Sequence, residues 1–342
     1  MTVKIVSLPL AQWPEADQAA WAGACQPSKR FQRGGSASHL QKTTRTSMLR
    51  AYGYLLEHCQ RQGTFDSGLQ PAGHVTFDCI NQFILELRVR VESVARYTYL
   101  ERIHRLSRIL NPLSEFIWLR DIVLQLKDEM RPRPKAARIV PADRLYDVGL
   151  QLMNRARRNK DKTALQRARL YRDGLLVALL SVCPIRLKNL ASLAIDRQVT
   201  QIENTWWIVL EGSETKNGRP DERPLPDLLG SLVTEWLETW RPLFLDPGKA
   251  MWASTKGGGL AYTYVGTIIS ATTHRELGIT VNPHLFRDCA VFTIAHEAGD
   301  QMSMASALLQ HTDQRVTQKH YNRGSSILAV KAFHEILDDM AD

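Results

Sequence analysis

The chain has 342 residues, of which 44% are hydrophobic and 23% are charged, and its formal net charge is +9. This length is enough for two domains, and the balance of apolar and charged residues is that of a globular protein rather than a disordered chain. Five scattered cysteines without a CxxC pair exclude a disulfide scaffold and indicate reduced cytosolic thiols, and the strongest apolar run, residues 175–185, is too short to span a bilayer.

The first part of the chain predicts a bundle of helices behind a short extension. Residues 1–37 lack clear periodicity and end in the loop-like sequence KRFQRGGSAS, so we expect a loosely attached N-terminal extension with one short helix. Apolar residues then recur at helical spacing and predict a helical domain over residues 38–131. Its expected helices are 39–62, 76–88, 91–110 and 114–130. In the third helix, Arg96, Arg102, Arg105 and Arg108 form either a phosphate-facing stripe or a solvated surface.

Residues 132–141 are predicted to form a linker. The surrounding sequence RPRPKAARIVP, residues 131–141, combines prolines with basic residues, so it should be extended, exposed and unable to continue a helix. Residues 135–200 hold 14 basic and five acidic side chains. Such a concentration of charge suits a polyanion that lies across the domain junction, whereas charge alone leaves an ordinary basic surface as an equal alternative.

Residues 142–342 predict a second domain that is mostly helical and contains a small antiparallel sheet, so the expected fold class is mainly α (α+β). Two helices, 142–158 and 164–182, precede a β-rich stretch at 199–225. Further helices are expected at 227–240, 262–276, 283–298, 301–309 and 313–322. A last amphipathic stretch, 325–340, packs either on its own domain or on a neighbouring protomer.

Six side chains suited to attack on a phosphodiester stand in one order along this domain: Arg186, Lys216, His284, Arg287, His311 and Tyr321. Guanidiniums neutralise the extra charge of a five-coordinate phosphorus, histidines and a lysine move protons, and a tyrosine can be the nucleophile. Asn282 and Pro283 indicate the N-cap and first residue of a helix, which would direct His284, Arg287 and the helix N-terminus toward one anion.

The order Arg, Lys, HxxR, His, Tyr resembles the signature of the tyrosine recombinases, the phage-integrase family, over about 200 C-terminal residues. The context agrees, because Pro184 ends an apolar helix just before Arg186, and Lys216 lies near the turn of the β-rich stretch. The resemblance implies a core-binding bundle and a catalytic domain that form a clamp around double-stranded DNA. It also implies a homo-oligomer, from dimer to tetramer, on the DNA, with no metal and no cofactor.

The resemblance implies a role for each residue. Arg186 and Arg287 would bind the non-bridging oxygens of the scissile phosphate, which the planar guanidinium suits. Tyr321 would form a 3′-phosphotyrosyl link and release a 5′-hydroxyl. Lys216 would give a proton to the leaving oxygen, His284 would assist proton transfer, and His311 would form a hydrogen bond with the phosphate. Arg219 or Arg223 remains an alternative to Lys216.

Three departures from the family pattern keep other functions open. Asn189 stands where an acidic residue is frequent, Gln310 replaces a common glycine, and the interval from His311 to Tyr321 is one residue longer than usual. Unbroken helix would hold that histidine and tyrosine roughly 15 Å apart, so either the segment turns back or the tyrosine comes from another protomer.

The preferred function is a site-specific recombinase, an integrase of a mobile genetic element, in the bacterial cytoplasm at the nucleoid. The alternatives are a type IB topoisomerase and a DNA-binding protein of the same fold that has lost cleavage. A metal hydrolase built on His284, His311 and His320 fits poorly, because no carboxylate has motif-like spacing with them.

Overall fold

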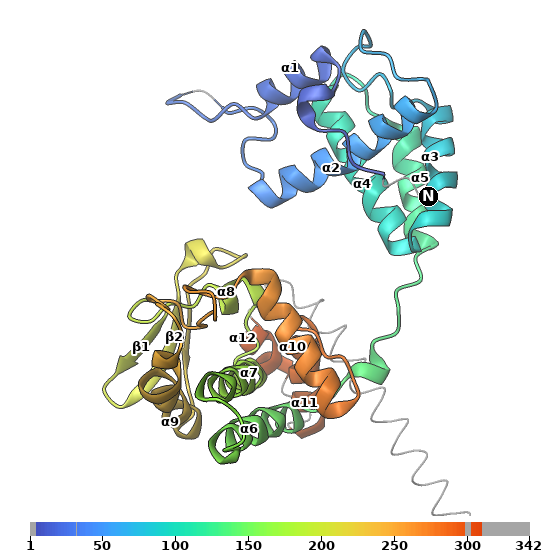
Figure 1. Cartoon of the computed structure of the whole chain (residues 1–342). Helices are drawn as coiled ribbons and strands as arrows, with labels where there is room; N and C mark the ends of the chain where they lie inside the picture. The colour runs from blue at the N-terminus through green and yellow to red at the C-terminus, as the bar shows by residue number, and fades with distance from the viewer. Residues whose placement is uncertain (1–4, 32, 298–301, 310–342) are drawn as a thin grey trace, which may run out of the picture. The chain divides into compact units, whose positions relative to one another are not determined.

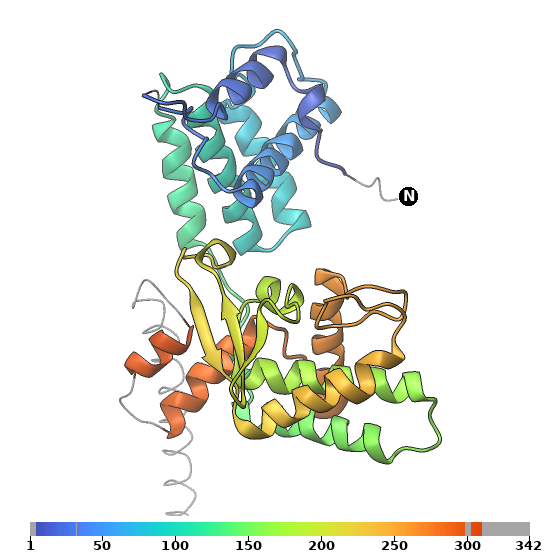
Figure 2. The ribbon, with the colours of Figure 1, turned by 90° about the vertical axis from the view of Figure 1, so that its left-hand side faces the viewer.

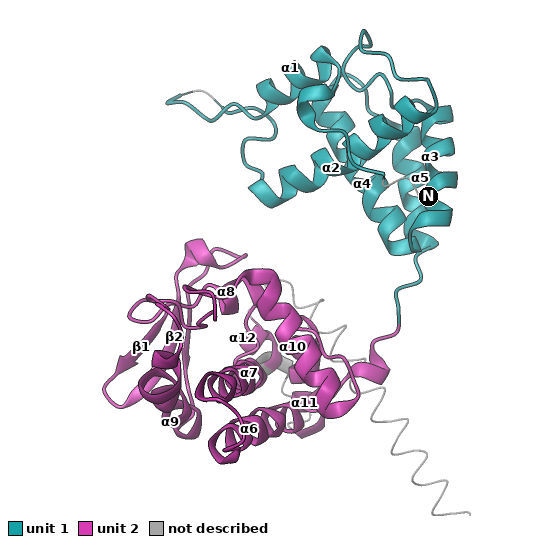
Figure 3. Ribbon diagram, in the orientation of Figure 1, with its two compact units in different colours: residues 1–133 teal, residues 134–342 magenta. Residues whose placement is uncertain are grey.

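The computed structural model describes residues 5–31, 33–297 and 302–309. The chain divides into two compact units, residues 1–133 and residues 134–342 (Figure 3). Both are mainly helical, and the described part of the second also holds a three-stranded antiparallel sheet. The predicted fold class is therefore confirmed.

Unit 1 is a bundle of helices around one apolar core (Figure 1). Fully buried side chains at helical spacing, such as Leu100, Ile103 and Leu106, face the centre, which explains why the sequence pattern located these helices. Thr76 caps one of them, since its hydroxyl accepts a hydrogen bond from the Cys79 amide at 3.2 Å. The helices are α1 (Glu15–Ala24), α2 (Lys42–Arg61), α3 (Phe77–Arg90), α4 (Ser93–Leu110) and α5 (Ile117–Asp128).

The N-terminal segment is part of this core. Leu8, Trp13 and Trp21 are buried in it. The Asp17 carboxylate, also buried, accepts hydrogen bonds from the Tyr52 hydroxyl at 2.8 Å and the Ala72 amide at 2.7 Å. The expectation of a loosely attached segment is therefore wrong, because α1 contributes both apolar surface and a buried polar anchor to the bundle.

The segment between the bundle and the second unit's helices is bound to α11 (Leu285–Glu297). Lys135 forms an ion pair of 2.8 Å with Asp288, and the Val140 amide lies 3.4 Å from the Cys289 sulfur. A short 3₁₀ turn, Ala136–Arg138, lies between these contacts, and Val140 is buried. The part that follows Pro134 is thus attached to the second unit rather than fully extended and exposed.

Unit 2 begins with a helical hairpin, α6 (Ala142–Arg158) and α7 (Ala164–Val182), whose helices lie side by side (Figure 1). They approach closely where Gly149 faces Gly174, since a Cβ on Gly149 would lie 2.7 Å from the Gly174 carbonyl oxygen. Thr163 and Gln166 form a capping box at the start of α7. The two helices supply about a third of the buried residues in the core of the unit.

The sheet follows the short helix α8 (Leu187–Ala191) and has the order β1-β2-β3. Ile208 of the central strand pairs with Val199 on one side and Arg223 on the other (Figure 2). Its strands are β1 (Val199–Ile202), β2 (Thr205–Leu210) and β3 (Asp221–Pro224).

The remaining helices surround the hairpin. The stretch expected as a single helix at 227–240 changes from α9 (Asp227–Glu235) to a π-helical turn, Trp236–Trp240. Then come α10 (Tyr262–Leu277), α11 and α12 (Met302–Leu309), and α12 packs on α11 through Ala305 and Leu309. The predicted helices 313–322 and 325–340 lie outside the described residues. No helix in the described ranges is both long and apolar enough to cross a membrane.

Candidate active site

Arg186 occupies the turn between α7 and α8. The first helix ends at Val182, Pro184 follows, and Arg186 adopts an extended conformation as the N-cap of α8, where its carbonyl accepts a hydrogen bond from the Leu190 amide at 2.9 Å. Its side chain is half-buried. The proline therefore ends one helix and the arginine precedes the next, as the sequence predicted.

Arg287 is buried in the first turn of α11, with 7% of its surface exposed. Its Nη1 donates a hydrogen bond to the Pro184 carbonyl at 2.7 Å, and its Nη2 donates to the Leu309 carbonyl at 2.6 Å. The first bond ties Arg287 to the backbone two residues before Arg186. Two arginines about 100 positions apart are thus brought to one place.

The pKa of Arg287 reports a surplus of positive charge there. This pKa is lowered to about 10, first by burial and then by the neighbouring guanidiniums of Arg186 and Arg223, against the smaller opposing effects of Asp221 and Asp288. The two neighbouring guanidiniums bring three cations close together at a buried position. An anion is the natural ligand of this arrangement.

His284 stands at the N-terminal end of the same helix. The Asn282 side-chain oxygen accepts a hydrogen bond from the Leu285 amide at 3.1 Å, which is the cap that the sequence predicted. His284 is exposed while Arg287, three residues later, is buried, and the Arg287 amide donates to the His284 carbonyl at 3.3 Å. The HxxR pair thus presents one side chain to solvent and one to the interior.

Lys216 is exposed on the connection between β2 and β3. The preceding Thr215 is buried and fixes the turn, because its hydroxyl donates to the Arg219 carbonyl at 2.7 Å. Gly218 has φ +72°, a left-handed conformation that favours glycine. The hairpin position predicted for Lys216 agrees with this structure, but the residue is not part of the buried arginine cluster.

Arg223 is a member of the cluster that the sequence suggested only as a substitute for Lys216. It forms an ion pair with Asp221 at 2.9 Å, and its Nη2 donates to the Leu308 carbonyl at 2.7 Å. Its Nη1 is buried with no hydrogen-bond partner among the described residues. Strand alternation could have shown this burial, because Arg223 pairs with the fully buried Ile208 and so faces inward.

The end of α12 is held by two of these guanidiniums. Arg223 binds the carbonyl of Leu308, and Arg287 binds the carbonyl of Leu309. The last carbonyls of a helix have no partner within it, so these bonds satisfy both. The two remaining predicted site residues follow α12 in the sequence and lie outside the described residues: His311 and Tyr321. We name the set of Arg186, Arg223 and Arg287 the arginine cluster.

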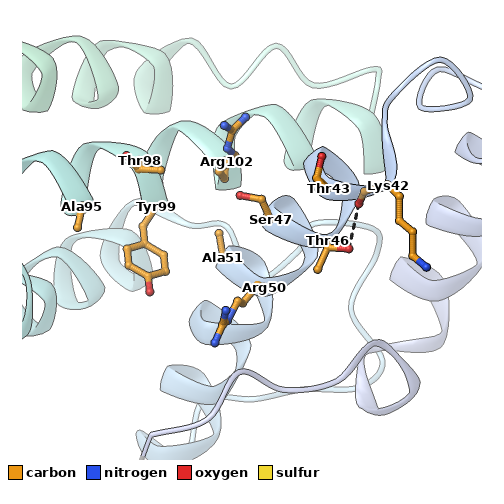
Figure 4. A pocket seen from close by; sticks show the side chains of 10 residues that line it. All are labelled: Lys42, Thr43, Thr46, Ser47, Arg50, Ala51, Ala95, Thr98, Tyr99 and Arg102. Atoms are coloured by element: carbon orange, nitrogen blue, oxygen red, sulfur yellow. Dashed lines mark hydrogen bonds between the residues drawn. The ribbon is translucent and has the colours of Figure 1, made fainter. Parts of the chain in front are cut away.

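Unit 1 has a separate basic hollow between α2 and α4, which we name the α2–α4 groove (Figure 4). It has a volume of about 640 Å³. Its cations are Lys42, Arg50 and Arg102, hydroxyl groups come from Thr43, Thr46, Ser47, Thr98 and Tyr99, and Ala51 and Ala95 complete the lining. Arg102 belongs to the basic stripe expected from the sequence, whereas Lys42 and Arg50 come from the facing helix and were not predicted. Cations and hydroxyls together are suited to phosphate groups.

Histidine, cysteine and carboxylate side chains do not form a group of three or more that could hold a metal ion in the described ranges. The guanidiniums of the arginine cluster can bind an anion, fix its orientation and neutralise charge that develops on it.

Comparison with known proteins gives a consistent result. No protein-family model matches the chain. The tyrosine recombinase XerC of Pseudomonas fluorescens Pf-5 is 29% identical over 188 residues, which cover 54% of this chain and 57% of that protein. The chain therefore spans little more than half the length of this curated relative.

Solved structures share the fold over a greater length. The XerH site-specific recombinase bound to palindromic difH substrate in a post-cleavage complex has a TM-score of 0.56 at 13% identity, over 95% of this chain and 98% of that chain. The Tn1549 transposon integrase in complex with a circular intermediate DNA has a TM-score of 0.55 at 12% identity, over 84% and 91%. The resemblance to the tyrosine recombinases is confirmed.

Proposed function

We propose that this chain is a site-specific DNA recombinase that cleaves and rejoins DNA strands through a covalent 3′-phosphotyrosyl intermediate. The observation that carries the proposal is the hydrogen bond from buried Arg287 to the Pro184 carbonyl, which brings Arg287 beside Arg186. These two arginines occupy the first and fourth places of the motif order, and their proximity is what a scissile phosphate requires.

The electrostatics favour a phosphodiester as the ligand. Burial and two neighbouring guanidiniums disfavour the charge of Arg287, so a bound phosphate would relieve both the repulsion and part of the desolvation. The non-bridging oxygens acquire additional charge in the five-coordinate transition state. A pocket with surplus positive charge therefore stabilises that state more than the ground state, which is the condition for catalysis.

Catalysis would proceed in two symmetrical steps. The Tyr321 oxygen forms a bond to phosphorus while the bond from phosphorus to the 5′ oxygen breaks, and Lys216 gives a proton to that leaving oxygen. A 5′-hydroxyl of another strand then attacks the phosphotyrosyl link and releases the tyrosine. His284 would assist proton transfer and His311 would hydrogen-bond the phosphate. Because the covalent link conserves the bond energy, neither ATP nor a metal ion is needed.

The α2–α4 groove supports a second contact with the same DNA. Its three cations and its hydroxyl groups can bind several phosphates without reading sequence. Double-stranded DNA as partner, assembly as a dimer or tetramer, and a place in the bacterial cytoplasm at the nucleoid belong to this proposal. The similarity in fold to a transposon integrase supports service to a mobile genetic element.

A nicked suicide substrate tests the cleavage step. The DNA that flanks the gene would first be sequenced for direct repeats, and the substrate would carry these repeats. The nick lets the short 5′ fragment diffuse away so that the covalent adduct accumulates. The native chain should form an adduct that resists denaturant, and Tyr321→Phe should form none. Tyr262→Phe, an exposed tyrosine of the same unit, serves as the control and should react normally. Absence of an adduct with the native chain, or its persistence in Tyr321→Phe, would overturn the proposal.

A further inference from the structure

We propose that Cys59 and Cys79 are a modification site, at which a small oxidant such as a hydroperoxide converts the two thiols into a reversible disulfide between α2 and α3. The two sulfur atoms lie 3.1 Å apart, although the residues are 20 positions apart and belong to different helices. A disulfide bond is about 2.05 Å long, so the sulfurs need to move together by only about 1 Å. This inference does not depend on DNA cleavage.

A small oxidant can reach the pair. Cys59 is buried and Cys79 is partly exposed, and both line a hollow of about 350 Å³ on unit 1. The other walls of the hollow include His74, Asp78 and Gln82, which are polar. A molecule of the size of hydrogen peroxide therefore finds both space and hydrogen-bond partners next to the sulfurs.

The two thiols differ in reactivity. A hydrogen bond from Cys79 lowers the pKa of Cys59 in spite of burial, and the same interaction, with burial, raises the pKa of Cys79. In the proposed reaction Cys59 is the sulfur that reacts as thiolate, and Cys79 is the partner that resolves the product. Burial instead raises the pKa of Cys183 to about 11 and that of Cys289 to about 12, so these thiols should stay reduced.

The reaction balances with hydrogen peroxide as the oxidant. The Cys59 thiolate attacks one peroxide oxygen, an S–O bond forms, and the O–O bond breaks with loss of hydroxide. Cys79 then loses its proton and attacks the Cys59 sulfur, which forms the S–S bond and expels the second oxygen as hydroxide. The two sulfurs give up two electrons, and with the released protons the peroxide becomes two molecules of water.

Closure of this bond would constrain the connection between α2 and α3. The unfolded chain would lose freedom over the enclosed loop, so the midpoint of thermal unfolding of unit 1 should rise by several degrees. The same helix α2 carries two cations of the α2–α4 groove, Lys42 at its first residue and Arg50 near its middle. Oxidation would thus crosslink the helix that supplies half of that groove.

Peptide mass analysis of the full chain tests the site. The reduced protein would be treated with dilute hydrogen peroxide, its remaining thiols alkylated without reduction, and its tryptic peptides weighed. We expect one linked peptide pair that contains Cys59 and Cys79 and is lighter than its parts by two hydrogen atoms, with Cys183 and Cys289 alkylated. Dithiothreitol should restore both thiols, and Cys183→Ser should behave as the native chain.

Two results would overturn the inference. One is alkylation of both Cys59 and Cys79 in native protein that has been treated with peroxide. The other is linkage that appears only after guanidinium unfolds the chain. Neither readout depends on the folding of a variant, and Cys79→Ser adds a further check, because its Cys59 should stop at the sulfenic acid, which dimedone traps.

Discussion

Each unit contains a cluster of three basic side chains, and the two clusters differ in the groups that hold them. In unit 1 the Glu86 carboxylate contacts His58, Arg61 and Arg90. Although burial acts to raise the pKa of Glu86, the hydrogen bonds from these three lower it to about 2. The arginine cluster of unit 2 is held largely by backbone carbonyls, and the pKa of Arg287 is lowered to about 10.

Because the two clusters are held by different groups, the cluster around Glu86 has a structural role, whereas the arginine cluster is suited to binding an anion. In unit 1 two guanidiniums face two carboxylates, because Arg61 also pairs with Glu57, so this cluster stabilises the fold and leaves little positive charge for another anion. Carbonyl oxygens fix guanidiniums in position but carry no net charge. The arginine cluster therefore keeps most of its positive charge for a ligand, at a cost in stability that a bound phosphate offsets.

The largest effect should follow from removal of one guanidinium of the arginine cluster. Arg186→Ala should lower the rate of single-turnover cleavage by about 100- to 1000-fold, because Arg186 acts on charge that develops in the transition state. Duplex affinity should change little, since other phosphate contacts remain. Lys188→Ala, an exposed cation on the same short helix, is the matched control. A loss that fell mainly on affinity would make Arg186 an ordinary phosphate contact and would break the comparison.

Arg223→Ala should affect both stability and rate. It leaves Asp221 without its partner and frees the Leu308 carbonyl, so urea unfolding should show a loss of about 3 kcal/mol. Cleavage should fall about tenfold at a temperature where the variant is folded, because the end of α12 loses one of its two bonds. Arg219→Ala, which is exposed on the same connection, should do neither. If the cleavage rate were unchanged, the role of Arg223 would be limited to stabilising the fold.

Changes in the α2–α4 groove should lower the affinity for DNA and leave the cleavage rate unchanged, which is the reverse of the effect expected at Arg186. The double change Arg50→Ala with Arg102→Ala should weaken duplex binding about tenfold and reduce the slope of log affinity against log salt by about two, one for each phosphate contact. Cleavage at saturating DNA should stay the same. Arg120→Ala, an exposed cation of α5, controls for net charge. An unaltered salt slope would exclude the groove from the DNA-binding surface.

The smallest effect is expected at Glu86, and it tests the structural side of the comparison. Its pKa is lowered in the folded chain, so its contribution to stability is present above pH 4.5 and is lost as the pH falls toward 2. Glu86→Gln should lower the free energy of unfolding of unit 1 by about 1 kcal/mol at pH 7, after allowance for solvent screening. The difference should vanish near pH 2, and Glu115→Gln should show none. A difference that persisted at pH 2 would reflect packing instead of charge.

Sequence signals that act within a few residues were enough to predict much of the fold. The sequence predicted 142–158 and 164–182 as helices, and α6 and α7 have these bounds, because periodicity, Thr163 at a cap and Pro184 beyond the end all act within a few residues. The N-terminal segment was interpreted wrongly for the opposite reason. Asp17 is buried against Tyr52 and Ala72, which lie 35 and 55 positions away in the sequence. No periodicity of the sequence connects residues so far apart.

In the candidate site, too, features that depend on nearby residues could be predicted from the sequence, and features that depend on distant contacts could not. The cap at Asn282 and the place of Arg186 followed from nearby residues, whereas the choice of these residues as a set came from a family resemblance. Arg223 was undervalued because its contact with Leu308 spans 85 positions, and an arginine beside an aspartate in a polar stretch resembles solvated surface. The approach of Cys59 to Cys79 is likewise invisible without the packing of two helices.

The residues that follow Pro134 are attached to the same helix that contains Arg287. Lys135 is paired with Asp288, the neighbour of Arg287 in α11, and Ala142 donates a hydrogen bond at 2.8 Å to Thr293 of the same helix. Lys135 and Ala142 therefore hold two turns of α11, and the first of these turns contains Arg287.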